Sequence, residues 1–417
     1  MSIKRLSAQR KPSILIKLFI FLILILIISF TSVPKHLNAS NEFIDITAEA
    51  AIIMDYDSGK ILWEKNSSEK LYPASITKIM TGIVAIENIT DLNEIVKIPR
   101  NASGTNSSFF PFKTGDRISI MDLLKAALIN SNNNATIAIA EYVSGSESDF
   151  VKLMNEKARE IGARDTFFQN TNGLDTKYPE HKTTAMDLAI IAKYCMNNEL
   201  FRKIISIKND YIIINDKKVD IFNTNILLFF DYIKGIKTGF TKNAGHCLVL
   251  YSERQGLKLI TVVLKSEDNK RAADMLKLID WANDNYSNTN IVNSSKIYKT
   301  IKVRNGPSEV PLDLYPQTDF TQLVNINDKI EITETLSTDL VLPVAKGQEI
   351  GKISVYINNE NVKDIKIISK NSIDQPIITQ SIVVEKNQNP KKVLIFLLSF
   401  YFLIFSFIII KNLFIRG

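Results

Sequence analysis

The 417-residue chain has only two cysteines and three histidines, the residues that most often bind transition metals or carry out redox chemistry. Cys195 and Cys247 lie among apolar residues and lack the paired spacing of a metal or redox site. We therefore expect two buried thiols, although the sequence leaves a disulfide between them open. A Ser-His-Asp triad would need His36, His181 or His246, and no Gly-x-Ser-x-Gly motif accompanies a serine in a suitable context. The chemistry predicted below needs neither a metal nor a cofactor.

The chain also lacks a basic stripe with interleaved aromatic residues, and its formal net charge is only +7. Much of the positive surplus lies at the two ends, in Lys4, Arg5, Arg10, Lys11, Lys17, Lys391, Lys392, Lys411 and Arg416. Nucleic acid is therefore not an expected partner. Positive charge beside an apolar run is instead typical of the ends of membrane segments.

Two runs of the sequence lack charge altogether. Residues 18–30 follow the basic start and have the length of the apolar region of a secretory signal. Residues 1–39 are thus a predicted signal peptide, with an uncleaved N-terminal anchor as the alternative. Residues 393–410 are eighteen residues without a charge, which is close to what one membrane crossing needs. We predict a transmembrane helix there, with the body of the chain exported.

One short stretch carries a candidate nucleophile and its base. Pro73 suits the entry to a helix, and Ser75 and Lys78 then lie three residues apart on one helical face. A serine hydroxyl needs a base within hydrogen-bond reach, and a lysine whose charge is disfavoured by burial or by a second cation can be that base. Ser-x-x-Lys alone is weak evidence, because a helix start followed by a solvated lysine gives the same pattern.

Two further motifs follow downstream, Ser131-Asn132-Asn133 and Lys237-Thr238-Gly239. Penicillin-binding proteins and class A β-lactamases carry Ser-x-x-Lys, Ser-Asp-Asn and Lys-Thr-Gly in this order. Asn132 replaces the aspartate, whereas the outer Ser131 and Asn133 are kept. Helical patterns at 118–129 and 135–143 place this motif on the connection between two helices, where capping by asparagine is the structural alternative.

With their flanks at 71–81 and 231–241, the three motifs closely resemble the low-molecular-mass penicillin-binding proteins that act as serine-type D-alanyl-D-alanine carboxypeptidases. The resemblance runs from about Ala48 to about Asn285, and a weaker likeness continues through the following β-rich segment. It implies a penicilloyl-serine transferase fold, in which a five-stranded antiparallel sheet flanked by helices lies beside an all-helical part.

The residue patterns independently predict an α+β fold, because strands precede and follow a block of helices. With what the resemblance implies, the expected fold class is a β-lactamase/transpeptidase-like domain, an antiparallel sheet with helices, followed by a small all-β domain. Its expected strands are 48–54, 60–64, 211–214, 219–222, 246–251 and 257–264, and its further helices are 150–161 and 268–285, with a loop at 99–116. The predicted domains are a catalytic domain at 43–287, a polar linker at 288–295, a β-rich domain at 296–371 that includes a strand at 341–343, and a tether at 372–390.

The residue types predict an acyl-enzyme mechanism, and the resemblance implies that its target is the penultimate D-alanine of a peptidoglycan stem. Ser75 attacks the carbonyl carbon, and Lys78, kept partly neutral by burial beside Lys237, takes the hydroxyl proton. Ser131 relays the proton towards the leaving amine of the terminal D-alanine. Asn133 holds the substrate amide and orients Lys78, and water then hydrolyses the acyl-enzyme.

The resemblance implies further roles for the third motif. The backbone N–H groups of Ser75 and Phe240 would bind the developing oxyanion. Lys237 and Thr238 would hold the terminal carboxylate, and Gly239 would leave room for the substrate along the strand edge. β-Lactam antibiotics are the expected inhibitors, because their ring carbonyl and carboxylate mimic the dipeptide.

Two alternatives stay open on the sequence alone. A β-lactamase of the same fold would need a deacylating glutamate between the second and third motifs, but residues 169–175 contain none, and Glu180 stands in no matching context. A non-catalytic, membrane-tethered wall-binding protein would not need the three intact motifs. We therefore predict a carboxypeptidase at the cell membrane, with its catalytic domain on the extracytoplasmic side.

Overall fold

The computed structural model describes residues 43–105, 110–306, 308–337, 340–375 and 397–404. The predicted signal or anchor at 1–39 and most of the predicted helix at 393–410 lie outside these residues. The described chain forms two compact units. The first contains the residues up to Ile291 together with Phe320–Lys329, and the second contains Val292–Asp319 and the residues from Ile330 onwards.

A five-stranded antiparallel sheet forms the centre of the first unit. Its strands, in spatial order, are β2 (Ile61–Lys65), β1 (Ala50–Asp55), β9 (Leu257–Ser266), β8 (Gly245–Arg254) and β7 (Ile233–Thr241). Both faces of the sheet are buried. Alternate residues of a strand point to opposite faces, and on β1 Ile52 packs into one hydrophobic core whereas Ile53 packs into the other. The predicted antiparallel sheet with helices is thereby confirmed.

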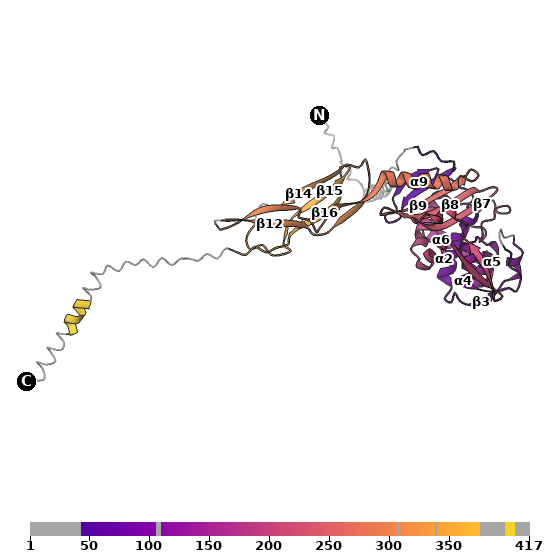
Figure 1. Cartoon of the computed structure of the whole chain (residues 1–417), viewed down its shortest axis with the longest axis horizontal. Helices are drawn as coiled ribbons and strands as arrows, with labels where there is room; N and C mark the ends of the chain where they lie inside the picture. Colours follow the sequence, from indigo (N-terminus) through magenta and orange to yellow (C-terminus); the bar gives the residue numbers. More distant parts are fainter. Residues whose placement is uncertain (1–42, 106–109, 307, 338–339, 376–396, 405–417) are drawn as a thin grey trace, which may run out of the picture. The chain divides into compact units, whose positions relative to one another are not determined.

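Helices cover both faces of this sheet. In Figure 1, α9 (Arg271–Asn285) lies on one face, and α2, α4, α5 and α6 gather on the opposite side. In the described part of the chain before α9, the helices and helical turns are η1 (Ala74–Thr77), α2 (Lys78–Asn88), α3 (Arg100–Ser103), α4 (Ile120–Leu128), α5 (Asn133–Ser144), α6 (Glu147–Glu160), α7 (Ala185–Met196), α8 (Glu199–Ile205) and η2 (Ile226–Phe229). The short α3 lies within the predicted loop at 99–116, which corrects that prediction, and α8 was not predicted.

Side-chain caps explain where several helices begin. The Ser119 hydroxyl accepts a hydrogen bond from the backbone N–H of Asp122 at 3.0 Å, and Thr184 accepts one from Asp187 at 3.0 Å. Each bond satisfies a backbone donor that the first helical turn leaves unpaired, and each acceptor side chain is of a preferred capping type. The helix predicted from the pattern at 118–129 is therefore confirmed as α4.

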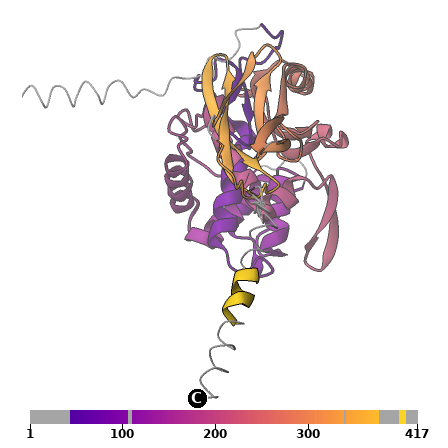
Figure 2. The ribbon, with the colours of Figure 1, turned by 90° about the vertical axis from the view of Figure 1, so that its left-hand side faces the viewer.

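The first unit also contains small two-stranded sheets. β3 (Ile95–Lys97) pairs with β4 (Arg117–Ser119), and β5 (Asn209–Ile214) pairs with β6 (Lys217–Phe222), the latter visible as a long ribbon in Figure 2. Asn215 and Asp216 connect β5 to β6 with φ angles of 48° and 62°. Both angles are positive, as a two-residue turn that matches the twist of a hairpin requires. The predicted hairpin at 211–222 is confirmed.

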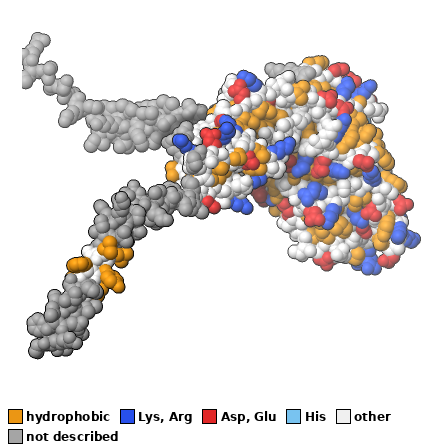
Figure 3. Space-filling model, turned by 60° about the vertical axis from the view of Figure 1, so that its left-hand side comes forward, with side chains coloured by type: hydrophobic (Ala, Val, Ile, Leu, Met, Phe, Trp, Pro, Cys, Tyr) orange, Lys and Arg blue, Asp and Glu red, His pale blue; other side chains and the backbone are white. Residues whose placement is uncertain are grey.

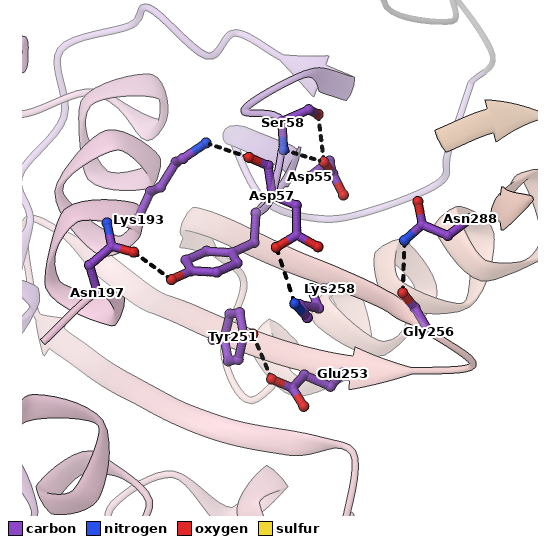
Figure 4. Close-up of polar contacts among 11 residues, drawn as sticks. Asp55, Asp57, Ser58, Lys193, Asn197, Tyr251, Glu253, Gly256, Lys258 and Asn288 are labelled. Carbon is purple, nitrogen blue, oxygen red and sulfur yellow. Dashed lines mark hydrogen bonds and ion pairs between the residues drawn. The ribbon is translucent and has the colours of Figure 1, made fainter. Parts of the chain in front are cut away.

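The turn between β1 and β2 is tied to the surrounding structure by polar contacts (Figure 4). One carboxylate oxygen of Asp55 accepts the backbone N–H of Ser58 at 2.7 Å, which closes the turn. The hydroxyl of Tyr56 donates to Asn197, at the end of α7, at 2.7 Å. Lys258 on β9 pairs with Asp57 at 3.1 Å. These contacts fix the hairpin that leads into the Ser75 segment.

The predicted linker at 288–295 is largely wrong. Residues up to Val292 belong to β10 (Tyr286–Val292), which pairs with β13 (Phe320–Asn325) in a two-stranded sheet. A β-propensity signal in Tyr286 and Ile291 was hidden by the asparagines between them. This pairing assigns β13 to the first unit, although the strand lies within the β-rich stretch of the sequence.

The second unit contains a five-stranded sheet, as its β-rich pattern predicts. Its strands, in spatial order, are β11 (Lys299–Asn305), β12 (Ser308–Pro316), β16 (Glu360–Ser369), β15 (Glu349–Ile357) and β14 (Ile330–Leu336). The strand predicted at 341–343 is wrong, because Pro343 has no N–H for a ladder. Val344 instead forms an isolated bridge with Ile373.

Candidate active site

Ser75 and Lys78 lie side by side where η1 passes into α2. The Nζ atom of Lys78 donates a hydrogen bond to Ser75 Oγ at 2.8 Å and another to the carbonyl oxygen of Asn172 at 2.8 Å. The lysine side chain is fully buried, whereas Ser75 is half-buried. An amine this close to a hydroxyl can accept its proton once the amine is neutral.

Burial lowers the pKa values of both lysines, which favours their uncharged forms. The pKa of Lys78 lies well below its usual range, first because the side chain is buried and second because Lys237 places another positive charge nearby. Lys237 is also fully buried, and burial together with the Arg271 guanidinium lowers its pKa to about 7. The site thus contains one strongly perturbed lysine beside the serine and a second that titrates near neutral pH.

The third motif lies on β7, directly against η1. A Cβ atom added to Gly239 would lie 2.8 Å from the carbonyl oxygen of Pro73 and 3.2 Å from Cβ of Ala74. Only glycine lets the strand approach the serine segment this closely. Arg271, on α9, donates to the Gly239 carbonyl at 3.1 Å and was not singled out from the sequence. Cys247 pairs with Gly239 in the β7–β8 register and is a buried free thiol, as is Cys195.

The side chains next to Gly239 differ in exposure. Thr238 is buried, and its hydroxyl lies 2.6 Å from that of Thr224. The next residue, Phe240, is 56 % exposed, and its ring packs against His246 with centroids 4.5 Å apart. β7 is the last strand in the order of the sheet among the described residues, so one of its edges has no strand partner there, which is the kind of edge that an extended peptide can join.

The second motif lies at the start of α5, and α5 packs against α2. Ser131 has a φ of 63° and precedes the helix. Asn132 caps α5 by accepting from Ala135 N–H at 3.0 Å, and its amide donates to the carbonyl of Phe110 at 2.8 Å. Asn133 is the first residue of α5, so the turn predicted through the asparagines ends earlier than expected.

Thr224 connects the second motif to the third. Its backbone N–H donates to the carbonyl of Ile129, two residues before Ser131, at 3.2 Å, and its hydroxyl contacts Thr238. The segment before η2 thus fixes the distance between the end of α4 and β7.

The loop at 167–182, in which the sequence shows no matching glutamate, completes the site. Phe167 and Lys182 form a two-way backbone bridge, at 2.8 and 3.1 Å, which closes the loop at its base. Inside it, the Asn170 side chain accepts the N–H of Gly173 at 2.7 Å. This turn presents the Asn172 carbonyl to Lys78. Asparagine and glycine predict the turn, but its contact with a lysine 94 residues away depends on tertiary packing.

The glutamate that approaches this loop comes from a helix. Glu147, in the first turn of α6, accepts from the backbone N–H of Thr171 at 2.9 Å and from its hydroxyl at 2.8 Å. Its carboxylate therefore holds the loop in place. Glu180 is exposed, and its backbone N–H donates to Gln169 at 3.0 Å.

Comparison with known proteins agrees with this arrangement. Residues 35–268 match the D-alanyl-D-alanine carboxypeptidase family of peptidases. The chain belongs to this family. Residues 286–375 match the C-terminal domain of penicillin-binding protein 5. The chain is therefore a serine-type carboxypeptidase, a hydrolase of the class that the three motifs predict.

Individual members of the carboxypeptidase family cover most of the chain. The D-alanyl-D-alanine carboxypeptidase DacF of Bacillus subtilis is 32% identical over 335 residues, which span 78% of this chain and 85% of DacF. DacC of Escherichia coli is 33% identical over 353 residues, with 79% and 85% covered. The structure of penicillin binding protein 5 from Haemophilus influenzae superposes with a TM-score of 0.59 at 28% identity, covering 81% of this chain and all of that chain.

Proposed function

We propose that this carboxypeptidase removes the terminal D-alanine from peptidoglycan pentapeptide stems through an acyl-enzyme on Ser75. The observation that carries the proposal is the 2.8 Å contact between Ser75 Oγ and Nζ of the buried Lys78. The lowered pKa of Lys78 supports it as the general base. Ser75 Oγ bonds to the carbonyl carbon of the penultimate D-alanine, and its proton passes to Lys78.

The remaining steps return that proton to the leaving group. As the C–N bond to the terminal D-alanine breaks, the proton moves through the Ser131 hydroxyl to the departing amine. Water then attacks the ester and restores Ser75. Asn133 holds the substrate amide, and its place at the start of α5, on the helix that packs against α2, supports this role.

β7 supplies the groups that bind the substrate's terminal end and its developing charge. The substrate lies along the edge of β7 with its carboxylate on Lys237 and Thr238. A buried lysine whose pKa is near 7 supports this role, because the incoming carboxylate favours its charged form. The N–H groups of Ser75 and Phe240 stabilise the oxyanion. Gly239 leaves the strand without a side chain where it approaches Pro73.

Penicillins acylate the same serine, and the acyl-enzyme is long-lived. A β-lactamase would need a base for fast deacylation, and the loop at 169–175 offers no glutamate. The carboxylate of Glu147 already accepts two hydrogen bonds from Thr171. These contacts favour the carboxypeptidase over the lactamase.

One experiment separates the candidate functions. The full-length chain in detergent is incubated with a pentapeptide that ends in D-Ala-D-Ala, and released D-alanine is measured against the Ser75→Ala variant. We expect release from the parent alone, with persistent labelling by penicillin. Rapid turnover of penicillin without D-alanine release would establish a β-lactamase, and neither activity in a folded protein would indicate a scaffold.

We propose further that the C-terminal segment holds the enzyme at the cell membrane, with the catalytic unit on the extracytoplasmic side. The support is the uncharged run at 393–410. Within this run, the short helix at 397–404 has exposed apolar side chains, and the exposed fraction of these residues ranges from 48 % to 76 % (Figure 3). Among the described residues, no helix is long and apolar enough to cross a membrane. Deletion from Lys391 onward should release active enzyme in cell fractionation, and retention after signal cleavage would contradict this anchor.

A further inference from the structure

A chain of buried hydrogen bonds leads from the loop at 167–182 to the residue before the nucleophile. The backbone N–H of Gln169 donates to Nδ1 of His181 at 3.0 Å. Nε2 of His181 lies 2.8 Å from the hydroxyl of Thr77. That hydroxyl donates to the carbonyl oxygen of Ala74 at 2.8 Å. His181 and Thr77 are both completely buried.

The direction of each bond follows from the donors that are present. Nδ1 accepts from an amide N–H, so the ring proton of a neutral His181 is on Nε2. Nε2 therefore donates to Thr77, which leaves the threonine proton for the Ala74 carbonyl. Burial and the charge of Lys78 lower the pKa of His181 to about 4, so this neutral tautomer persists at working pH.

The acceptor at the end of the chain has a backbone conformation that needs support. Ala74 has a φ of 48°, which is unfavourable for a residue with a Cβ atom. Its carbonyl belongs to the same planar, trans peptide unit as the N–H of Ser75, so the two groups point in opposite directions. Whatever orients the Ala74 carbonyl therefore also orients the Ser75 N–H.

The loop also packs directly onto this peptide. A Cβ atom on Gly173 would lie 1.8 Å from the Ala74 oxygen, and Gly173 has a φ of 88°. The backbone of Leu71, at the start of the same segment, pairs with that of Thr183 at 2.8 and 2.9 Å. The Lys182 ammonium lies 3.3 Å from the centre of the Tyr72 ring. Contacts from the middle of the loop and from residues at its C-terminal end thus converge on residues 71–77.

We propose that His181 is a positioning residue, which acts through Thr77 to hold the Ala74–Ser75 peptide so that the Ser75 N–H faces the developing oxyanion. This inference rests on the proposed role of Ser75 as the nucleophile. It gives the loop at 167–182 a second function. Besides contacting Lys78 through the Asn172 carbonyl, the loop aligns one of the two oxyanion donors.

The test compares full-length variants by the second-order rate of penicillin acylation and by the affinity of a boronic-acid analogue of D-alanine. The boronate forms a tetrahedral adduct on the serine, so its affinity reports the oxyanion site. Thr77→Val removes the hydroxyl with little change in shape. We expect both quantities to fall by about 10²-fold, as when one oxyanion donor is lost. Thr77→Ser should restore both.

His181→Gln provides the second variant and a test of coupling. It can place a donor near Thr77 but loses the Nδ1 acceptor for Gln169, so we expect a smaller loss. Because the two residues act in one chain, the double variant should be no worse than Thr77→Val alone. Thr166→Val is the matched control. It removes a buried hydroxyl that contacts Thr183 and Asp187, and acylation per folded molecule should stay near that of the parent.

Several outcomes would overturn the proposal. One is an acylation rate of folded Thr77→Val equal to that of the parent. Another is a double variant whose loss equals the product of the two single losses. The third is a variant that binds a non-reacting peptide more weakly but keeps the parent's acylation rate and boronate affinity. Thermal unfolding and circular dichroism verify the fold of each variant. If Ser75→Ala still took up penicillin, the proposed nucleophile would be wrong. If only the results predicted for the Thr77 and His181 variants were not observed, the positioning role would be wrong and the assignment of Ser75 would stand.

Discussion

Lys78 and Lys237 are both completely buried, and the charge of Lys237 helps to lower the pKa of Lys78. The two proposed roles require different charge states. Lys78 must be neutral to act as a base, and Lys237 must be charged to bind the substrate carboxylate. Arginine remains charged at working pH and cannot serve as a base. Substitution by arginine therefore distinguishes the two roles.

Lys78→Arg should lose acylation of Ser75 by at least ~10²-fold, the usual effect of removing a general base. Lys237→Arg should keep part of the activity, since a guanidinium also pairs with a carboxylate, and its defect should appear mainly in KM. Acylation kinetics on D-Ala-D-Ala peptides measure both effects. Amidation of the substrate carboxylate provides the control, and it should harm the parent far more than Lys237→Ala. Equal losses in the two arginine variants would show that these roles are misassigned.

The pH dependence of kcat/KM follows from the same pair of lysines. The pKa of Lys237 is lowered to about 7, so this side chain is charged below that pH and neutral above it. Carboxylate binding should weaken as the pH rises through about 7, which gives kcat/KM an alkaline limb. Lys78 must lose its proton to act, which gives an acid limb. A pH–rate profile of Lys237→Arg should lack the alkaline limb, and an unchanged profile would contradict the assignment.

Gly239→Ala should inactivate the enzyme without unfolding it. The added Cβ atom would meet the Pro73 carbonyl at 2.8 Å, so β7 must move away from η1. A displacement of about 1 Å at a reacting site can reduce the rate by ~10²-fold. Penicillin acylation and thermal unfolding, measured together, test this. Near-normal acylation would mean that β7 tolerates the side chain and that its close approach is not required.

Asn132→Asp should destabilise the protein, although aspartate is the residue found in related motifs. The side-chain oxygen that caps α5 is retained, but the amide that donates to Phe110 is lost. Because the Phe110 carbonyl is only partly buried, loss of this hydrogen bond costs about 1 kcal/mol of unfolding free energy. Urea unfolding of the two proteins measures the difference. Equal stability would show that the Phe110 contact is replaced, for example by water.

The features that the sequence predicted correctly depend on local patterns. The strands predicted at 48–54 and 60–64, the helix within 118–129 and the strands at 211–214 and 219–222 each follow from residue types at short spacing, and the structure contains them as β1, β2, α4, β5 and β6. Ser75 and Lys78 share a face because they are three residues apart, and the structure places their side-chain atoms 2.8 Å from each other. Local spacing therefore indicated the reacting pair.

The features that the sequence did not predict depend on contacts between distant segments. Lys78 reaches the carbonyl of Asn172, and His181 reaches Thr77 across 104 residues. No local pattern specifies such pairs, because a backbone carbonyl carries no residue-type signal and a single buried histidine is usually structural. β10 was missed for a related reason, since its partner β13 lies beyond two other strands. Turn chemistry located the loop at 167–182, but only packing revealed what it holds.

The most direct test of the central claim identifies the serine that carries the acyl group. The full-length enzyme is labelled with a mass-tagged penicillin, quenched and digested with trypsin. Cleavage after Lys70 and Lys78 yields the peptide Leu71–Lys78, in which Ser75 is the only serine. We predict that the penicilloyl mass is found on this residue and is absent from Ser75→Ala. A stoichiometric label on any other serine, or labelling that persists in Ser75→Ala, would contradict the account.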